Sequence, residues 1–287
     1  MAGLIGLVGC GSTSAGSPGA ARSPAPATTA SSAASPAPSA ATPRPTVAPA
    51  GKPSVQPGNP AQVCSQAGTY LTAVRTGEHS GYDETVFQFS GTLPGYTVER
   101  VQAVYSDPKG TPIPLAGQSC LRVVFHGTSA VCPQPLHQTY TGPTVLTPYY
   151  PELLTVSAAG DFEGVLSFGI GLAAAQGGYH VFTLTSPDRL VIDVSHVALG
   201  KFPGIWDITS WPQYWATQYS WLNGHQPWLS CPSSVVQVWA GGYGSGSVVR
   251  QVSANTFKVT KPDGKTFTVT GVRPVSVPGP WVITKIA

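Results

Sequence analysis

The feature that most constrains the fold of this chain is a long stretch without the side chains needed for a core. Residues 11–62 consist almost entirely of Ala, Pro, Ser, Thr and Gly, and their only charges are Arg22, Arg44 and Lys52. Such a segment buries too little apolar surface to offset the entropy lost on ordering, and its prolines favour extended polyproline II conformations. We therefore expect a disordered linker over residues 10–62, which leaves about 225 residues for one large or two small domains.

A short apolar motif, Leu7-Val8-Gly9-Cys10, precedes this linker. It resembles the bacterial lipobox, in which a diacylglyceryl group is attached to the cysteine sulfur and a signal peptidase then cuts before the cysteine. We expect residues 1–9 to be a truncated signal-peptide remnant, because they contain no Lys or Arg and are too short for a complete signal sequence. The resemblance implies an exported lipoprotein that carries palmitate-type acyl chains on Cys10 and is anchored at the outer face of the cell membrane. The alternative is a soluble protein in which the motif occurs by chance.

Four further cysteines, Cys64, Cys120, Cys132 and Cys231, agree with export. An even number of cysteines in an exported chain predicts two disulfides, with three connectivities open. We favour Cys120–Cys132, which would close a short excursion, together with Cys64–Cys231, which would join the ends of the folded part. No pair has the C-x2-C spacing of a metal site, and we expect neither a metal nor a cofactor.

From Thr69 onward the pattern predicts a mainly β fold. Short runs rich in β-branched and aromatic residues alternate with clusters of Gly, Pro, Asp and Ser, as in a sandwich or barrel. The predicted strands are residues 86–89, 96–101, 121–126, 153–158, 165–170, 179–184 and 190–194.

Several of these runs belong to a longer pattern. Its segments are Val74–Phe89, Pro94–Val98, Asp161–Leu166 and Val181–Val194, in that order. Over residues 66–197 they resemble the AMIN-like domain of actinobacterial lipoproteins. The resemblance implies a small β-sandwich domain over residues 63–202, related to AMIN domains that are thought to target envelope proteins to peptidoglycan, and it brings no catalytic residues. The 120–132 excursion and the proline-rich residues 133–151 depart from the family pattern.

Residues 203–287 differ from the rest of the chain in composition, because all seven tryptophans lie there. We expect a small Trp-rich α+β module with a short helix within residues 230–241. Strands are predicted over residues 248–253, 257–260, 266–272 and 281–286, with a hairpin turn at Lys261–Lys265.

The densest aromatic cluster of this module is Tyr214, Trp215, Tyr219 and Trp221. Exposed indole rings stack on sugars, so these residues are candidates for binding glycan. The alternative is that they form the core, since a module of about 85 residues needs large side chains to build one.

Composition and motifs narrow the function. The net charge of +3 comes with no basic cluster in the sequence, which excludes a nucleic-acid partner. We find no G-x-S-x-G elbow, no phosphate loop and no H-E-x-x-H motif, and the six histidines are scattered, so we do not expect an enzyme.

The leading expectation is a non-enzymatic lipoprotein that docks on peptidoglycan or on an envelope protein. One alternative is an enzyme or accessory acting on cell-wall polymer, with the Trp-rich module binding glycan. Another is a small-solute receptor, against which the size and the scarcity of predicted helix argue.

Overall fold

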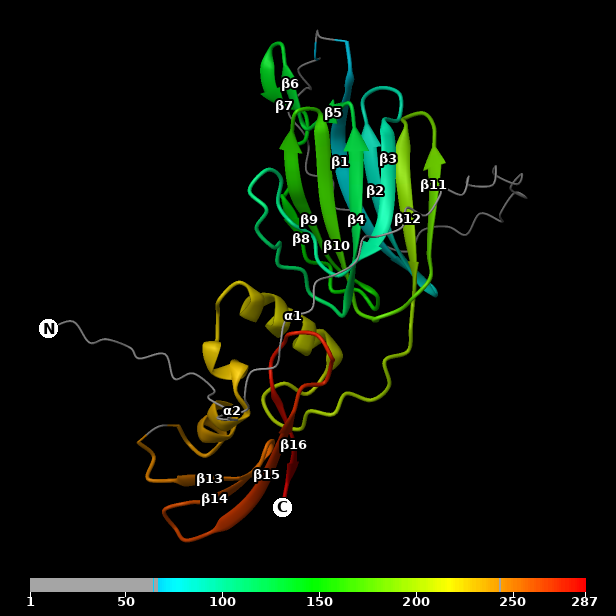
Figure 1. Cartoon of the computed structure of the whole chain (residues 1–287). Helices are drawn as coiled ribbons and strands as arrows, with labels where there is room; N and C mark the ends of the chain where they lie inside the picture. The colour runs from blue at the N-terminus through cyan, green and yellow to red at the C-terminus, as the bar shows by residue number, and fades with distance from the viewer. Residues whose placement is uncertain (1–63, 65–66, 243) are drawn as a thin grey trace, which may run out of the picture. The chain divides into compact units, whose positions relative to one another are not determined.

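The computed structural model describes residues 64, 67–242 and 244–287, as a β-sandwich followed by an α+β module (Figure 1). Cys10 and the predicted linker lie outside the described residues. Among those described, no helix is long and apolar enough to cross a membrane.

The sandwich consists of two five-stranded sheets, and its strands agree with the mainly β prediction. The first sheet has the order β11-β12-β2-β1-β5 and the second has the order β3-β4-β10-β9-β8. The strands of the first sheet are β1 (Thr69–His79), β2 (Tyr82–Phe89), β5 (Thr128–Ser129), β11 (Tyr179–Leu184) and β12 (Arg189–Ser195). Those of the second are β3 (Gly95–Val101), β4 (Ser119–His126), β8 (Val145–Leu146), β9 (Leu153–Phe162) and β10 (Val165–Leu172). A two-stranded hairpin, β6 (Val131–Pro133) and β7 (Leu136–Gln138), follows β5.

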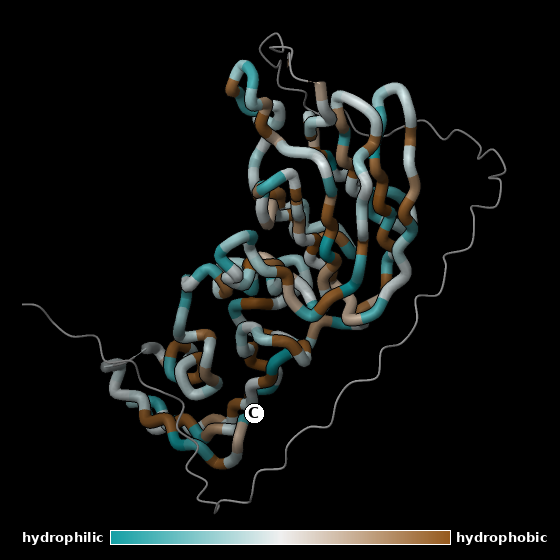
Figure 2. The backbone as a smooth tube through the Cα atoms, turned by 45° about the horizontal axis from the view of Figure 1, so that its top comes forward, coloured by the Kyte–Doolittle hydropathy of each residue, from teal (hydrophilic) through white to brown (hydrophobic). Residues whose placement is uncertain are grey.

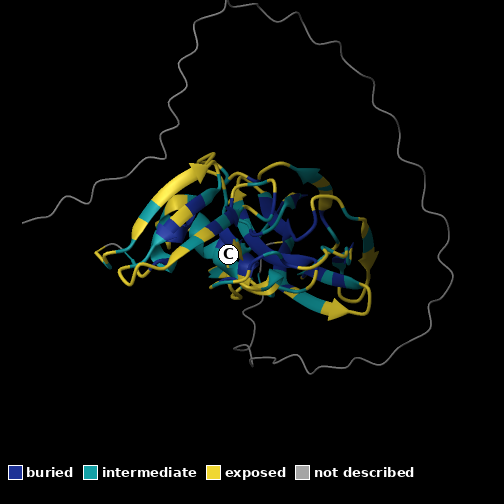
Figure 3. Ribbon diagram, turned by 90° about the horizontal axis from the view of Figure 1, so that it is seen from below, coloured by how far each residue is buried: buried dark blue, intermediate teal, exposed yellow. Residues whose placement is uncertain are grey.

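Aromatic packing between the sheets forms the centre of the sandwich core. The ring of Phe87 on β2 lies 5.3 Å from that of Phe125 on β4 and 4.9 Å from that of Phe168 on β10, measured between centroids. Tilted and edge-on contacts of this kind stabilise a core beyond the area they bury. Hydrophobic residues recur along the strands of the sandwich (Figure 2), and the buried residues lie in its interior (Figure 3).

The C-terminal module contains two helices and a four-stranded antiparallel sheet. Its elements are α1 (Trp211–Leu222), a 3-10 turn η1 (Pro227–Ser230), α2 (Pro232–Trp239), β13 (Val248–Ser253), β14 (Thr256–Thr260), β15 (Thr266–Val272) and β16 (Val282–Ile286). The sheet order is β13-β14-β15-β16, so β13 and β16 are its edges. The strands, the hairpin turn and the helix within 230–241 match the sequence predictions.

Helix α1 was not predicted. Its Trp, Tyr, Thr and Ser residues have lower helix propensity than Ala or Leu, so tertiary packing must supply much of its stability. Ser210 caps its first turn by accepting a hydrogen bond from the Gln213 amide, and Pro212 occupies a position where a missing N–H costs little.

Gln218 on α1 connects the module to the sandwich. Its side chain is 1% exposed, its Oε1 accepts the Gly117 N–H at 2.8 Å, and its Nε2 donates to the Pro278 carbonyl at 3.0 Å. Gly117 has a φ of +121°, and a Cβ there would lie 2.0 Å from the Leu172 carbonyl oxygen. Ala116, Leu154 and Ala173 of the sandwich also belong to the module's core cluster. The two parts therefore share packed and hydrogen-bonded contacts.

We predict that Gln218→Leu lowers the free energy of unfolding by about 1–3 kcal/mol, because it leaves the Gly117 amide without its partner. Urea unfolding measures the change. Gln138→Leu, at an exposed position of β7, is the control and is expected to stay within about 0.5 kcal/mol of the parent. Equal stability of the two variants would contradict this role of Gln218.

Candidate functional site

A pocket of about 450 Å³ opens at the end of the sandwich where β1 begins. Such a volume lies in the range of small-ligand sites. Its walls come from the start of β1, from β5 and from the β6–β7 hairpin; the lining residues are Ala67, Gly68, Thr69, Tyr70, Gly127, Thr128, Ser129, Val131, Pro133, Leu136 and Gly164.

Two tight turns form one border of the pocket. Gly127 and Gly164 both have positive φ, at +72° and +76°, a conformation that glycine adopts without strain. The Gly127 N–H donates to the Gly164 carbonyl at 2.7 Å, which holds the two turns together. Asp161 supports the same border, because its Oδ2 accepts the Ser129 hydroxyl at 2.9 Å and the Ala130 N–H at 2.8 Å.

The Thr and Ser hydroxyl groups of the lining form hydrogen bonds within the domain. The Thr128 hydroxyl donates to the Thr69 carbonyl at 2.8 Å, and the Thr69 hydroxyl donates to the Thr92 carbonyl at 2.7 Å. The Ser129 hydroxyl bridges Asp161 and the Val131 N–H, which it accepts at 2.9 Å. These bonds preform the pocket, and the rest of its lining consists of glycine backbone, apolar side chains and Tyr70.

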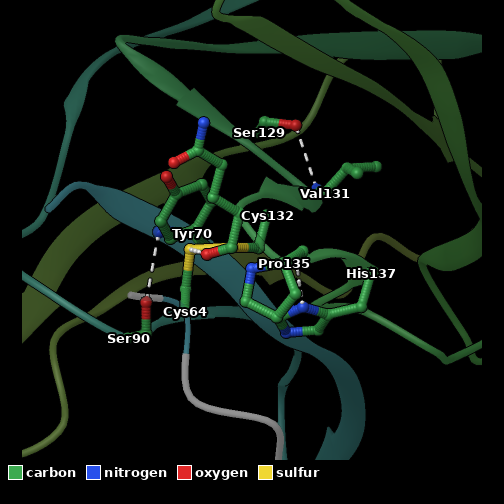
Figure 4. The surroundings of a disulfide bond; sticks show 9 residues. Cys64, Tyr70, Ser90, Ser129, Val131, Cys132, Pro135 and His137 are labelled. Atoms are coloured by element: carbon green, nitrogen blue, oxygen red, sulfur yellow. Dashed lines mark hydrogen bonds between the residues drawn. A yellow bond between two sulfur atoms is a disulfide. The ribbon is translucent and has the colours of Figure 1, made fainter. Parts of the chain in front are cut away.

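A disulfide, Cys64–Cys132, fixes the hairpin beside the pocket, with a Cα–Cα distance of 5.7 Å (Figure 4). In the same region Nδ1 of His137 lies 2.7 Å from the Pro135 carbonyl, and the Tyr70 N–H donates to the Ser90 hydroxyl at 3.3 Å. Leu136, at the hairpin tip, is 79% exposed, so an apolar side chain stands at the mouth of the pocket.

The pocket suits an uncharged group. The described residues that line it include no Asp, Glu, Lys, Arg or His. The described residues also contain no group of three or more His, Cys, Asp or Glu side chains that could hold a metal ion. The arrangement can hold a ligand by shape and backbone contact, without charge.

The observed disulfide corrects the pairing predicted from the sequence. Cys64 is bonded to Cys132, so neither Cys120–Cys132 nor Cys64–Cys231 is formed. Cys120 is a buried free thiol at the start of β4. The six extended residues from Cys120 to the end of β4 span about 20 Å, and Cys132 lies beyond that end of the strand. Burial raises the pKa of the Cys120 thiol, which makes it a poor nucleophile. Cys231 is the residue that precedes α2.

The predicted glycan-binding aromatics lie on α1. Tyr214 and Trp215 are 0% and 2% exposed and belong to the module core, so they cannot present a ring face to a sugar. Tyr219 and Trp221 are partly buried against the same core, and Nε1 of Trp221 donates to the Ser230 hydroxyl at 2.9 Å. Core formation thus accounts for Tyr214 and Trp215, while glycan binding through Tyr219 and Trp221 stays a prediction.

A cluster of charged residues, which sequence reasoning missed, lies at the opposite end of the sandwich. Asp83 is 0% exposed; its Oδ2 accepts the N–H groups of Glu152 and Leu153 at 2.7 and 2.8 Å, and its Oδ1 lies 2.8 Å from Nε2 of His196. Arg100 hydrogen-bonds the Ser119 hydroxyl and donates to the Gly177 carbonyl at 2.7 Å. These bonds join strand ends of both sheets.

Glu152 is the member of this cluster with an incomplete set of partners. It is 1% exposed; Oε1 accepts the Ala174 N–H at 3.1 Å, and Oε2 has no hydrogen-bond partner among the described residues. Burial raises the pKa of the Glu152 carboxyl, and neighbouring Asp83 adds to the rise, while the Ala174 N–H, Arg100 and His196 oppose it.

We predict that this raised pKa makes stability depend on pH. The folded protein holds the Glu152 proton more tightly than the unfolded chain, so the stability due to this group is present at acid pH and falls above about pH 4.3, until the folded pKa is passed. Each pKa unit corresponds to about 1.4 kcal/mol. Melting temperatures of the parent and Glu152→Gln between pH 4 and 8 measure the effect: their difference should move in favour of the variant as pH rises. Parallel curves would contradict the prediction.

Comparison with known proteins identifies the sandwich. The family profile of the AMIN-like domain matches residues 69–196, which confirms the resemblance over residues 66–197. No curated protein and no solved structure matches the chain significantly. The matched range runs from the first residue of β1 to the residue after β12, and it includes the pocket border, the disulfide-bonded hairpin and the Asp83 cluster. The chain is therefore an AMIN-like domain-containing protein.

Proposed function

We propose that this protein is an exported lipoprotein, anchored in the membrane through Cys10, whose AMIN-like domain docks on peptidoglycan without catalysing a reaction. The observation that carries the proposal is the AMIN-like match over residues 69–196, because domains of this kind are associated with peptidoglycan. An envelope protein is the alternative partner.

The pocket beside the Cys64–Cys132 disulfide is the place we assign to docking. It is preformed and uncharged, and its glycine borders let a ligand approach the backbone closely. Peptidoglycan offers sugar rings and short peptides, both of which can be held by shape and by backbone contact. Leu136 at the mouth supplies apolar contact area.

The proposal assigns no catalytic role to the charged cluster. Oδ2 of Asp83 accepts two N–H groups from the second sheet, and its Oδ1 contacts His196, which follows β12 of the first sheet. The hydrogen bonds described for His196 include none to a hydroxyl or thiol. A histidine that activates a nucleophile needs such a contact.

The length of chain after Cys10 fits an anchored protein that reaches the wall. Residues 10–64 could span up to about 180 Å if fully extended. The anchor at one end and the AMIN-like domain at the other would then act on different layers of the same envelope.

We predict that the full chain co-sediments with purified, insoluble peptidoglycan and that Leu136→Asp weakens this binding at least fivefold, because a charge at the mouth of an uncharged pocket must be desolvated on docking. Leu184→Asp is the matched control, since Leu184 is also an exposed leucine of the domain, at the end of β11. It should bind like the parent.

Two results would decide against this proposal. Absence of the parent from the peptidoglycan pellet would remove the wall as partner and leave an envelope protein. Equal loss in both leucine variants would remove the pocket as the docking place.

We also predict that Cys10→Ala releases the protein from the membrane when the chain is expressed behind a leader that directs export. The variant has no sulfur to acylate, so detergent phase partitioning should move it from the detergent phase to the aqueous phase. Ser12→Ala is the control and should remain in the detergent phase. A Cys10→Ala protein that stays there would show that the anchor is not this cysteine.

A further inference from the structure

The outer face of the C-terminal sheet gathers cations that are far apart in the sequence. Arg250 on β13 is the register partner of Lys258 on β14, and Lys285 on β16 is the partner of Thr270 on β15. Strand β13 is exposed along almost its whole length, and all three cationic residues are exposed.

Threonines occupy most of the other positions of this face, and Val248 and Val252 lie on its edge strand β13. Thr256 pairs with Thr270, and Thr260 with Thr266, with hydroxyl oxygens 3.4 and 3.5 Å apart. Thr268 lies opposite Lys258. The other face of the same strands carries Phe257, Val259 and Val269, which are buried in the module core. The strands thus alternate between an apolar inner face and an outer face of hydroxyl and cationic groups.

This face has no acidic residue to balance its charge. Residues 248–287 contain six Lys or Arg but only one acidic residue, Asp263, although the whole chain has a net charge of only +3. Asp263 lies in the β14–β15 turn, where it pairs with Lys265 at 3.1 Å. Arg250, Lys258 and Lys285 have no ion-pair partner among the described residues. Arg250 and Lys258 are direct cross-strand neighbours, an arrangement that is unfavourable unless an anion neutralises it.

We infer that the outer face of β13–β16 binds a linear polyanion whose repeating units carry phosphodiester and hydroxyl groups. The cations would pair with phosphates, and the threonines would hydrogen-bond the hydroxyls between them. Lys258 and Lys285 are two strands and two residues apart, about 12 Å between Cα atoms, so one extended chain can reach both.

The composition of the face argues for a polymer and against a lipid bilayer. Its apolar groups are the single valines Val248 and Val252, 64% and 65% exposed, and it has no aromatic side chain. Peripheral membrane anchors use large apolar or aromatic side chains for insertion. The same lack of aromatics argues against single-stranded nucleic acid, which proteins bind by stacking bases on such side chains.

Binding of the full chain to fluorescent poly(glycerol phosphate) of about a dozen repeats, measured by anisotropy over a salt series, tests the inference. The variant Lys258→Glu/Lys285→Glu should bind at least tenfold more weakly, and its slope of log K against log salt should fall by about 1.4, for two lost contacts. Lys109→Glu/Lys201→Glu is the matched control, because both positions are exposed, lie outside this sheet and give the same change in net charge. It should lose less than twofold.

Several results would overturn the inference. These are a parent that does not bind the polymer, a control that loses as much as the face variant, or a parent that binds only phosphatidylglycerol vesicles or single-stranded DNA. If the glutamate variant does not fold, Lys258→Gln/Lys285→Gln takes its place, with an expected loss of at least threefold. Leu136→Asp should bind the polymer like the parent, so failure of this inference and failure of peptidoglycan docking are distinguishable.

Discussion

The carboxylate of Asp83 connects the two sheets of the sandwich, and the order of the surrounding chain depends on it. Asp83 lies on β2 of the first sheet, while the two N–H groups it accepts belong to Glu152 and Leu153, where β9 of the second sheet begins. A buried charge with one partner removed typically costs several kcal/mol, so all its bonds constrain the structure together. The residues next to these bonds, Leu154 and Ala173, contact the C-terminal module, which therefore packs against the end that Asp83 organises.

The strands could be predicted from the sequence because each is a short apolar or alternating run between turn residues, and the AMIN-like pattern followed from those runs. The disulfide could not be predicted, because pairing depends on where two excursions meet in space. Cys120 and Cys132 are near in sequence, but β4 carries the chain away between them. Helix α1 was missed because its aromatic, Thr and Ser residues have low helix propensity and because a polar residue, Gln218, occupies a buried position of its inner face.

The two candidate surfaces escaped sequence reasoning for different reasons. The pocket is built from Gly, Thr and Ser, and its shape comes from backbone turns and hydroxyl bonds. The only sequence signal was the position of two glycines next to predicted strands, Gly127 just after 121–126 and Gly164 just before 165–170. The cationic face is created by register, since Arg250, Lys258 and Lys285 form no cluster along the chain. Alternation within the predicted strands 248–253 and 257–260 would have placed Arg250 and Lys258 on one face. The pairing of all four strands was needed to place Lys285 on the same face.

The two surfaces also differ in chemistry, and this difference bears on how the proposed anchored protein would bind polymers of the cell envelope. An uncharged pocket recognises shape and is insensitive to salt, whereas a cationic face binds through charge and weakens as salt rises. If both surfaces bind the same envelope, formation of one contact makes the other an intramolecular event with a high effective concentration. The hydrogen bonds of Gln218 to Gly117 and Pro278 would keep this effective concentration high, because they limit how far the module can move from the AMIN-like domain. A variant without these hydrogen bonds would keep both surfaces but lower the effective concentration of the second contact.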